Sequence, residues 1–250
     1  MSGRGQGRLR TLAFGDPGGR LWGAVVDSGR AALVAGDAAG HTAAWPLNEQ
    51  SWSVDGSDWR LAGPEFDLRV EAVTGAPAAG ESAAPATGDG VQELCRVHGS
   101  ISLGGQQHRV EGVGSRTVME DVDAGSLGSL RAVTGWFGAD EAFTLLALRD
   151  ARHRGQESDR VAATLFDPDR RLAVSDPRLS TTYDRAGVPT RVNLELWVGE
   201  GDNEFPRRAS GEAAAAGGAV TADGMEVRAV PLRCHSRGHD GAGVYVLAGL

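Results

Sequence analysis

Lysine is absent from the 250 residues of this chain, and all 25 of its cationic side chains are arginine. This absence excludes a Walker A lysine, a lysine Schiff base and the catalytic lysine of protein kinases. The Gly-x-Ser-x-Gly elbow, the His-Glu-x-x-His motif and a Gly-x-Gly-x-x-Gly motif after a strand are missing as well. We therefore expect a protein that needs no metal and no organic cofactor.

Basic runs are also missing, because positive charge clusters no further than short pairs such as Arg207 and Arg208. The formal net charge is −8. A nucleic-acid-binding protein usually carries a basic stripe, so this class is not expected here. An acidic balance of this size mainly favours solubility.

Long hydrophobic runs do not occur. The longest apolar stretch is about 142–148, far shorter than the roughly 20 residues of a membrane helix. Residues 1–10 contain arginine and glycine but no apolar signal region. We expect a cytoplasmic protein without a membrane span, and its oligomeric state stays open.

Cysteine is scarce, with Cys95 and Cys234 alone, which excludes a disulfide framework. Cys95-x-x-His98 and Cys234-His235 could be written as a zinc site. Cys95 and His98 are an odd number of residues apart on one predicted strand and so face opposite sides. A structural role for both cysteines is therefore favoured over a metal site.

Glycine, in contrast, is abundant at 37 of 250 residues, without a Gly-X-Y period. Glycine dispersed between short apolar runs indicates many turns and hence many strands. The runs recur about every 8–12 residues, as in all-β sandwiches and barrels. We predict a disordered tail over 1–8, an N-terminal β-domain over 9–74, a linker or exposed loop over 75–91, and a C-terminal β-domain over 92–250.

Three hairpins are predicted from period-two alternation and turn residues. The first joins 95–103 to 106–113 through Gly104 and Gly105. The second joins 130–137 to 142–149, with strands that are apolar on both faces. The third joins 160–166 to 171–174. Further strands are expected over 191–198, 205–213, 225–234 and 243–247.

The most unusual segment, 112–130, joins two of these hairpins yet is long, glycine-rich and acidic. Long connections in compact domains are often functional. Glu120, Asp121 and Asp123 could hold one proton at a raised pKa through mutual repulsion and partial burial, and Arg116 could stabilise a developing oxyanion. These four are the candidate catalytic residues, and a solvated acidic loop is the alternative.

Tryptophan outnumbers tyrosine, six to two. Large rings that line a β-cavity would suit a hydrophobic ligand. Trp136 and Trp197 lie in predicted strands, and Trp52 and Trp59 are weaker candidates from the first domain. Filling of the core is the alternative role for each ring.

Several segments together resemble one family. They are 95–99 (Cys-Arg-Val-His-Gly), 110–116 (Val-Glu-Gly-Val-Gly-Ser-Arg), 130–137, 142–149, 176–184, 194–197 and 241–246. About 150 residues of the chain are similar to the lipocalin-related superfamily of AttH and carotenoid 1,2-hydratase (hydroxyneurosporene synthase), which includes decalin-forming Diels–Alderases. The resemblance implies two consecutive lipocalin-like β-barrel or sandwich domains and a cavity for a hydrophobic small molecule. Where relatives have a His-x-Trp-Gly-type motif, this chain has 117–121 (Thr-Val-Met-Glu-Asp), which puts any activity of that motif in doubt.

Three functions follow from the resemblance and the residues. The first is a cofactor-free cyclase or isomerase on a hydrophobic polyene, polyketide or terpenoid intermediate. The second is a hydratase that adds water to an isoprenoid double bond, and the third is a non-catalytic carrier of a lipophilic ligand. A cyclase should have a closed cavity with few titratable groups, a hydratase an acid inside its cavity, and a carrier an open mouth without a buried acid.

Overall fold

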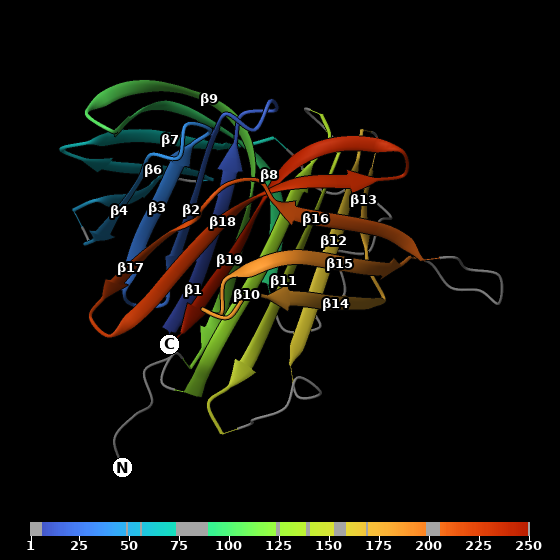
Figure 1. Cartoon of the computed structure of the whole chain (residues 1–250). Helices are drawn as coiled ribbons and strands as arrows, with labels where there is room; N and C mark the ends of the chain where they lie inside the picture. The colour runs from blue at the N-terminus through green and yellow to red at the C-terminus, as the bar shows by residue number, and fades with distance from the viewer. Residues whose placement is uncertain are drawn as a thin grey trace, which may run out of the picture.

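The computed structural model describes residues 7–48, 50–55, 57–73, 90–123, 126–138, 141–152, 159–168, 170–198 and 206–249. Its regular structure consists of antiparallel β-strands arranged in two curled sheets (Figure 1). The predicted all-β class with two lipocalin-like barrels is therefore confirmed. None of the described residues belongs to a helix with the length and hydropathy needed to cross a membrane.

The first sheet has nine strands in the order β4-β3-β2-β1-β9-β8-β7-β6-β5. Neighbouring strands of this sheet are consecutive in the chain, except that β1 pairs with β9, which brings the start of the chain beside residues about a hundred positions later. The strands are β1 (Gly7–Gly15), β2 (Leu21–Asp27), β3 (Ala31–Asp37), β4 (Thr42–Leu47), β5 (Trp52–Asp55), β6 (Asp58–Gly63), β7 (Phe66–Ala72), β8 (Gly90–Leu103) and β9 (Gln106–Val122).

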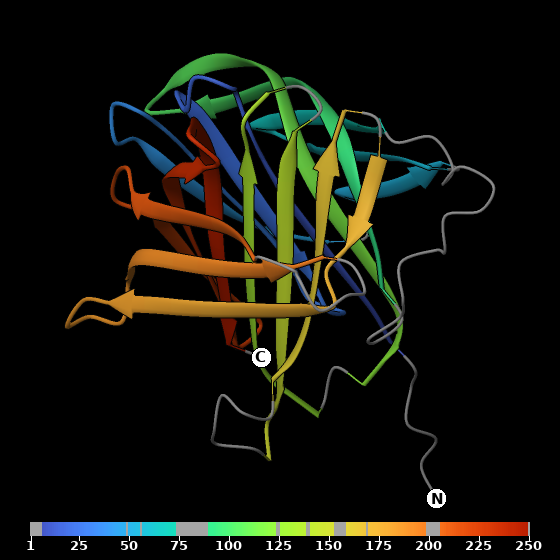
Figure 2. The same ribbon diagram turned by 90° about the vertical axis from the view of Figure 1, so that its right-hand side faces the viewer.

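The second sheet has ten strands, nine of them in the order β13-β12-β11-β10-β19-β18-β16-β15-β14, while β17 pairs with β18. Strands β14 and β15 cross β10, β11 and β12 at a steep angle, which curls the sheet over its own core (Figure 2). The strands are β10 (Leu127–Trp136), β11 (Ala142–Asp150), β12 (Arg160–Asp167), β13 (Arg170–Ala173), β14 (Asp176–Tyr183), β15 (Pro189–Trp197), β16 (Arg207–Ala213), β17 (Gly218–Ala222), β18 (Met225–Ser236) and β19 (His239–Gly249).

All three predicted hairpins form, as β8–β9, β10–β11 and β12–β13. The segment 112–130 differs from its predicted connection, because β9 continues as a strand to Val122. Gly112 and Gly114 make this continuation possible. A Cβ at Gly112 would stand 2.7 Å from the carbonyl oxygen of Gly15, and one at Gly114 would stand 2.5 Å from that of Ala13. Bare glycine thus lets β9 lie tightly against β1.

The boundary between the sheets falls between Val122 and Leu127. It does not coincide with the predicted linker over 75–91, because β8 and β9 return to the first sheet after that stretch. Gly90 and Val91 already belong to β8, and 74–89 lie outside the described residues. On the other side, Gly7 and Arg8 of the predicted tail belong to β1. A stretch of small residues marks a loop, but it does not say which sheet the next strand joins.

Glycine also serves the packing of large rings. Phe14 lies over Gly23, Trp22 over Gly36, Phe66 over Gly63, and Phe143 over Gly135. Each ring and its glycine are direct cross-strand partners. An aromatic ring over a cross-strand glycine covers backbone that has no side chain of its own and helps to pin the strand register.

Three apolar cores result. One fills the first barrel around Phe14, Leu61 and Leu68. Another fills the second barrel around Phe143, Val230 and Tyr245. The third lies between the two sheets and takes side chains from both. Because β1, β2 and β3 present alternate side chains to the first and third cores, these strands are apolar on both faces.

Candidate functional site

The apolar layer between the two sheets (the inter-sheet layer) is the candidate site. The first sheet contributes alternate residues of β1, β2, β3 and β9, and the second contributes alternate residues of β10, β11, β18 and β19. Trp22 and Trp136 are the largest side chains in it, and both are about 2% exposed. The layer therefore joins the two barrels by hydrophobic burial.

A cavity of about 360 Å³ opens at one end of the inter-sheet layer and is lined by both tryptophans. Its wall is otherwise made mainly of glycine, proline and aliphatic residues from the turn after β1 and from β18 and β19. Arg233 and Asp240 are the charged residues that line it. The exposed surface of the cavity is about equally polar and apolar, and its volume lies within the range of small-molecule sites.

Gly15 seats Trp136 at this cavity. A Cβ at Gly15 would stand 2.6 Å from Cζ2 of Trp136 and 2.7 Å from the carbonyl oxygen of Leu21. Gly15 is also the cross-strand partner of Trp22. The Trp136 ring of the second sheet thus occupies the space over Gly15 of the first sheet, beside Trp22.

Deeper in the inter-sheet layer, hydroxyl groups replace part of the apolar surface. Thr134, Thr144 and Thr164 are cross-strand neighbours on β10, β11 and β12. The Oγ1 atoms of Thr134 and Thr144 are 3.1 Å apart. Thr164 Oγ1 donates to Gln92 Oε1 of the first sheet at 2.7 Å. We call the three threonines and Gln92 together the Thr–Gln row. All four side chains are buried, and they form a polar bridge across the inter-sheet layer.

Several donors here have no hydrogen-bond partner within the described part of the chain. They are the indole Nε1 atoms of Trp22 and Trp136, the Nε2 amide of Gln92 and the hydroxyl of Ser115. A buried donor without a partner costs about 1–3 kcal/mol. The inter-sheet layer therefore offers hydrogen bonds that an acceptor on a bound molecule could take.

Arg116 lies elsewhere, inside the first barrel, with only 4% of its side chain exposed. Its Nε and Nη2 donate to Glu93 Oε2 at 2.9 and 2.7 Å, and its Nη1 donates to the Ser57 carbonyl. The guanidinium also lies 5.0 Å from the ring centroid of Trp59. Burial and pairing hold this cation in place on a single carboxylate.

The predicted acidic residues do not gather around Arg116. Glu120 is 55% exposed and pairs with Arg8 at 2.7 Å. Asp123 is half-buried and has a polar or electrostatic contact. The side chain of Asp121 lies outside the described residues. Glu120 thus has a surface position, while the role predicted for an acid of this segment stays a prediction.

The four candidate tryptophans fall in three places. Trp136 lines the inter-sheet cavity. Trp52 and Trp59 pack against each other in the first barrel, with ring centroids 5.1 Å apart. Trp197 alternates with the inward-facing Leu194 and Leu196 and lies near the Arg178 guanidinium, 5.9 Å from its ring centroid. The structure therefore joins Trp52 to Trp59 and leaves Trp136 and Trp197 apart.

The two cysteines are free and buried. Burial raises the pKa of each thiol to about 12, so both are neutral near pH 7 and poor nucleophiles or metal ligands. His98 lies on the opposite face of β8 from Cys95, as expected, and its Nδ1 is 2.8 Å from Glu111 Oε2 near the surface.

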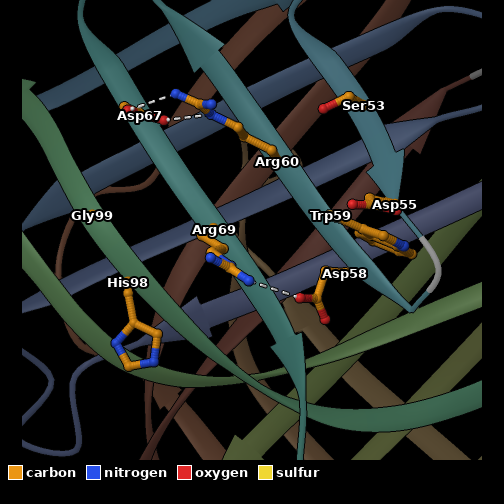
Figure 3. Close-up of a pocket in the computed structure, with 9 residues that line it drawn as sticks. All are labelled: Ser53, Asp55, Asp58, Trp59, Arg60, Asp67, Arg69, His98 and Gly99. Carbon is orange, nitrogen blue, oxygen red and sulfur yellow. Dashed lines mark hydrogen bonds and ion pairs between the residues drawn. The ribbon is translucent and has the colours of Figure 1, made fainter.

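A second hollow, of about 550 Å³, lies on the outer side of the first barrel (Figure 3). Four of its charged groups are paired with each other. Arg60 donates to both oxygens of Asp67, and Arg69 donates to Asp58. Because these pairs are largely exposed and neutralise each other, the hollow has the character of an ordinary polar surface.

The sequence interpretation missed Trp22, Gln92, Ser115 and the row of threonines. Trp22 was within reach of the same argument as the other tryptophans. The threonines sit at positions where the alternation of β10, β11 and β12 already required a buried side chain. The sequence does not show that β10, β11 and β12 place these threonines directly opposite one another.

Comparisons with known proteins bear on the fold. No protein-family model matches the chain, and no curated protein matches its sequence significantly. Solved structures do match over nearly its whole length. One, from Nitrosomonas europaea and assigned to AttH, has a TM-score of 0.64 at 10% identity and covers 98% of this chain and 92% of its own.

Two further structures agree. CghA, solved with Sch210972, has a TM-score of 0.67 at 11% identity and covers 99% of this chain and 89% of its own. Kievitone hydratase from Nectria haematococca has a TM-score of 0.60 at 11% identity and covers 97% and 88%. The chain thus has the fold of the AttH-like, lipocalin-related superfamily, as the sequence resemblance predicts. Its neighbours in that fold bear the names of a hydratase and of a protein solved with a small molecule.

Proposed function

We propose that the protein is a cofactor-free cyclase or isomerase whose hydrophobic polyene, polyketide or terpenoid substrate binds in the inter-sheet layer. One observation carries the proposal: Trp22 and Trp136, one from each sheet, line the cavity with indole N–H groups that have no hydrogen-bond partner within the described residues, and Gln92 holds a further such donor deeper in the same layer. An apolar molecule would fill the cavity, and its carbonyl oxygen would accept from Trp22, Trp136 or Gln92.

Such a site would act by shape and by hydrogen bonding. The walls would hold a flexible chain in a reactive conformation, so that proximity and orientation supply much of the rate. A donor aimed at a carbonyl oxygen stabilises the charge that grows on it during a cyclisation or a double-bond shift. Neither step requires the protein to gain or lose a proton permanently.

The alternative hydratase needs an acid that protonates an alkene. Among the described residues, Asp37 and Asp159 have buried carboxylates, with 9% and 3% of their side chains exposed. Asp37 pairs with Leu21 on the side of the first barrel core, and Asp159 pairs with Arg131 and Arg149 in the second barrel, so neither faces the inter-sheet layer. Asp240, which lines the cavity, is 94% exposed and pairs with His235. The described part of the inter-sheet layer therefore supports a cyclase or isomerase over a hydratase. A carrier would use the same cavity without turnover.

Mass spectrometry of a deletion strain separates these functions. Loss of a cyclase or isomerase should accumulate a precursor with the same mass as the missing product. Loss of a hydratase should accumulate a precursor that is lighter by one water, and loss of a carrier should leave the product's structure unchanged. Complementation with Gln92→Leu should restore little product, whereas complementation with the exposed variant Gln107→Leu should restore it fully. A mass difference of one water, or full rescue by Gln92→Leu, would overturn the proposal.

A further inference from the structure

The second barrel is not closed by hydrogen bonds along one side. In its sheet the end strands are β13 and β14, and they are not paired with each other. Figure 2 shows β14 running across β11 and β12. Side chains of β14 that point toward the barrel core, Leu179, Thr181 and Tyr183, are half-exposed. Solvent therefore reaches the inside of this barrel beside β14, at a place we call the seam.

Two arginines and one aspartate meet at the seam. Asp159 has only 3% of its side chain exposed, and it accepts from Arg149 Nε at 2.7 Å and from Arg149 Nη2 at 3.1 Å. It also accepts from Arg131, whose side chain is 8% exposed. Two guanidinium groups therefore share one carboxylate, and the trio carries one positive charge in excess.

Within the part of the chain that the structure describes, neighbouring charges do not remove this excess. Arg228 lies in the same cross-strand row as Arg131, with Leu247 between them. It pairs with Glu226 at 3.0 Å, so these two neutralise each other. Arg131 and Arg149 also carry far more N–H donors than one carboxylate can accept. Because Arg149 keeps 24% of its side chain exposed, an anion from solvent can reach this excess charge.

Hydroxyl groups continue the cluster. The Tyr245 hydroxyl lies 3.1 Å from that of Tyr183 and 3.2 Å from Thr181 Oγ1. Burial raises the pKa of Tyr245 above its usual value, so its hydroxyl stays protonated. The three hydroxyl groups supply three hydrogens, and the two hydrogen bonds between them use two. One hydrogen therefore remains to be donated to a bound molecule, from Thr181 or from Tyr183, which are both partly exposed.

Apolar side chains flank these polar groups. Val161 and Leu247 lie in the same cross-strand row as Arg131, and Leu179 precedes Thr181 on the inner side of β14. All three pack against the barrel core yet stay half-exposed. The seam therefore combines an excess cation, a spare hydroxyl donor and an accessible apolar wall.

We propose that the seam is a second binding site, which takes a carboxylic acid with an apolar chain. The carboxylate would accept from Arg131 or Arg149 and from a tyrosine or threonine hydroxyl. The chain would lie along Val161, Leu179 and Leu247. This site is separate from the inter-sheet layer and does not depend on the function proposed for it.

Displacement of a fluorescent fatty acid tests the proposal. Purified protein is titrated with cis-parinaric acid and then with dodecanoic acid, its methyl ester or dodecanol as competitors. We expect dodecanoic acid to compete at least tenfold better than the ester or the alcohol. Equal competition by all three would mean that the carboxylate is not recognised and would overturn the proposal.

Variants locate the binding. Arg149→Gln and Tyr183→Phe should each weaken binding of the acid by about tenfold, the factor that corresponds to the loss of about 1.4 kcal/mol. The double variant Arg131→Met with Asp159→Asn removes a charge pair together and so leaves no buried aspartate unpaired. Arg178→Gln is the control, because Arg178 is exposed on the outer side of β14 and paired with Asp176. Wild-type binding by all the seam variants, or an equal loss in Arg178→Gln, would contradict the assignment.

Gly15→Ala provides a further control, since it disturbs the inter-sheet cavity alone. It should leave acid binding at the seam unchanged. Loss of acid binding in Gly15→Ala together with wild-type binding in Tyr183→Phe would place the acid between the sheets and overturn the seam proposal. Wild-type acid binding in Gly15→Ala together with weakened binding in Tyr183→Phe would support the seam proposal.

Discussion

Each barrel buries an arginine, but the two arginines are balanced differently. In the first barrel Arg116 is hydrogen-bonded to Glu93, with the Ser57 carbonyl and the Trp59 ring as further partners, while Arg171 interacts with Glu93 only electrostatically. In the second barrel Arg131 must share Asp159 with Arg149. The hydrogen-bonded pair of the first barrel is neutral by itself, whereas the trio of the second carries one positive charge in excess. The same residue type is thus bound to a carboxylate of its own in one barrel and shares a carboxylate in the other.

Exposure of the carboxylates adds to this difference. Glu93 keeps 25% of its side chain in contact with solvent, whereas Asp159 keeps 3%. Water can therefore compensate for a lost partner in the first barrel far better than in the second. Variants of the two carboxylates should bring the difference out most clearly.

The largest effect is expected from Asp159→Asn. It leaves two guanidinium groups facing each other without a counter-charge, and breaking a buried pair costs about 3–5 kcal/mol. Glu93→Gln should cost less, about 1–3 kcal/mol, because Arg116 keeps the Ser57 carbonyl and the Trp59 ring. Urea unfolding of both variants measures the two costs. Equal costs would mean that the barrels bury their arginines in equivalent ways.

A smaller effect is expected where the barrels meet. Gly15→Ala would force Trp136 out of its seat, and overpacking of this kind costs about 1–3 kcal/mol. Gly249→Ala is the matched control, because a Cβ there meets nothing within 4 Å. Urea unfolding, followed by tryptophan fluorescence, should show a lower midpoint for Gly15→Ala alone. Identical curves for the two variants would argue against tight packing between the sheets.

Acid should weaken both barrels in the same direction. Burial alone would raise the pKa of Asp37 and of Asp167. Hydrogen bonds from His41 in the first case, and from Arg207 and Arg170 in the second, outweigh it and lower both pKa values. A carboxyl with a lowered pKa stabilises the fold above its unfolded pKa of about 3.9, and this contribution is lost as the pH falls below that value.

Asp37→Asn and Asp167→Asn should therefore lose stability near pH 7 and show a flatter decline below about pH 4. Thermal unfolding over pH 2.5–7, a range of about 4.5 pH units that includes the reference pKa of aspartate, measures how steeply each variant loses stability as the pH falls. A decline as steep as in the wild type would show that other carboxyls dominate. A change in one variant alone would assign the acid sensitivity to one barrel.

The smallest effect is expected at the outer hollow of the first barrel. Arg60 and Asp67 are 63% and 60% exposed, and such exposed pairs contribute little to stability. Arg60→Ala should leave the urea midpoint within experimental error of the wild type, in contrast to Asp159→Asn. A clear shift would show that this surface has a structural role.

Much of the fold was predictable because strand alternation and turn residues are local. Gly104 and Gly105 mark the turn of the β8–β9 hairpin, and the register pairs Leu103 with Gln106 as expected. The apolar faces of β10 and β11 likewise indicated strands buried on both sides. The division of the strands between two sheets was not local, since it depends on β9 pairing with β1.

Candidate residues were harder to predict than strands. Arg116 and Glu120 are four positions apart on one strand, yet the first is buried on Glu93 and the second pairs with Arg8 at the surface. Their difference comes from the point at which β9 loses one neighbour, because its pairing with β8 ends at Met119 while its pairing with β1 continues to Val122. The sequence shows the spacing of the two side chains but not which part of the strand is covered.

The sequence by itself determined that this chain would be an acidic, lysine-free protein of short strands with glycine turns, and its motifs pointed to the superfamily fold that the solved structures share. These properties follow from composition and from contacts between near neighbours. Tertiary structure alone decided that Gln92 meets Thr164, that Trp136 rests on Gly15, and that Arg131 and Arg149 share Asp159. The first two contacts join the two sheets and the third joins neighbouring strands of one barrel, so all three depend on register and curvature, which no single segment of the sequence specifies.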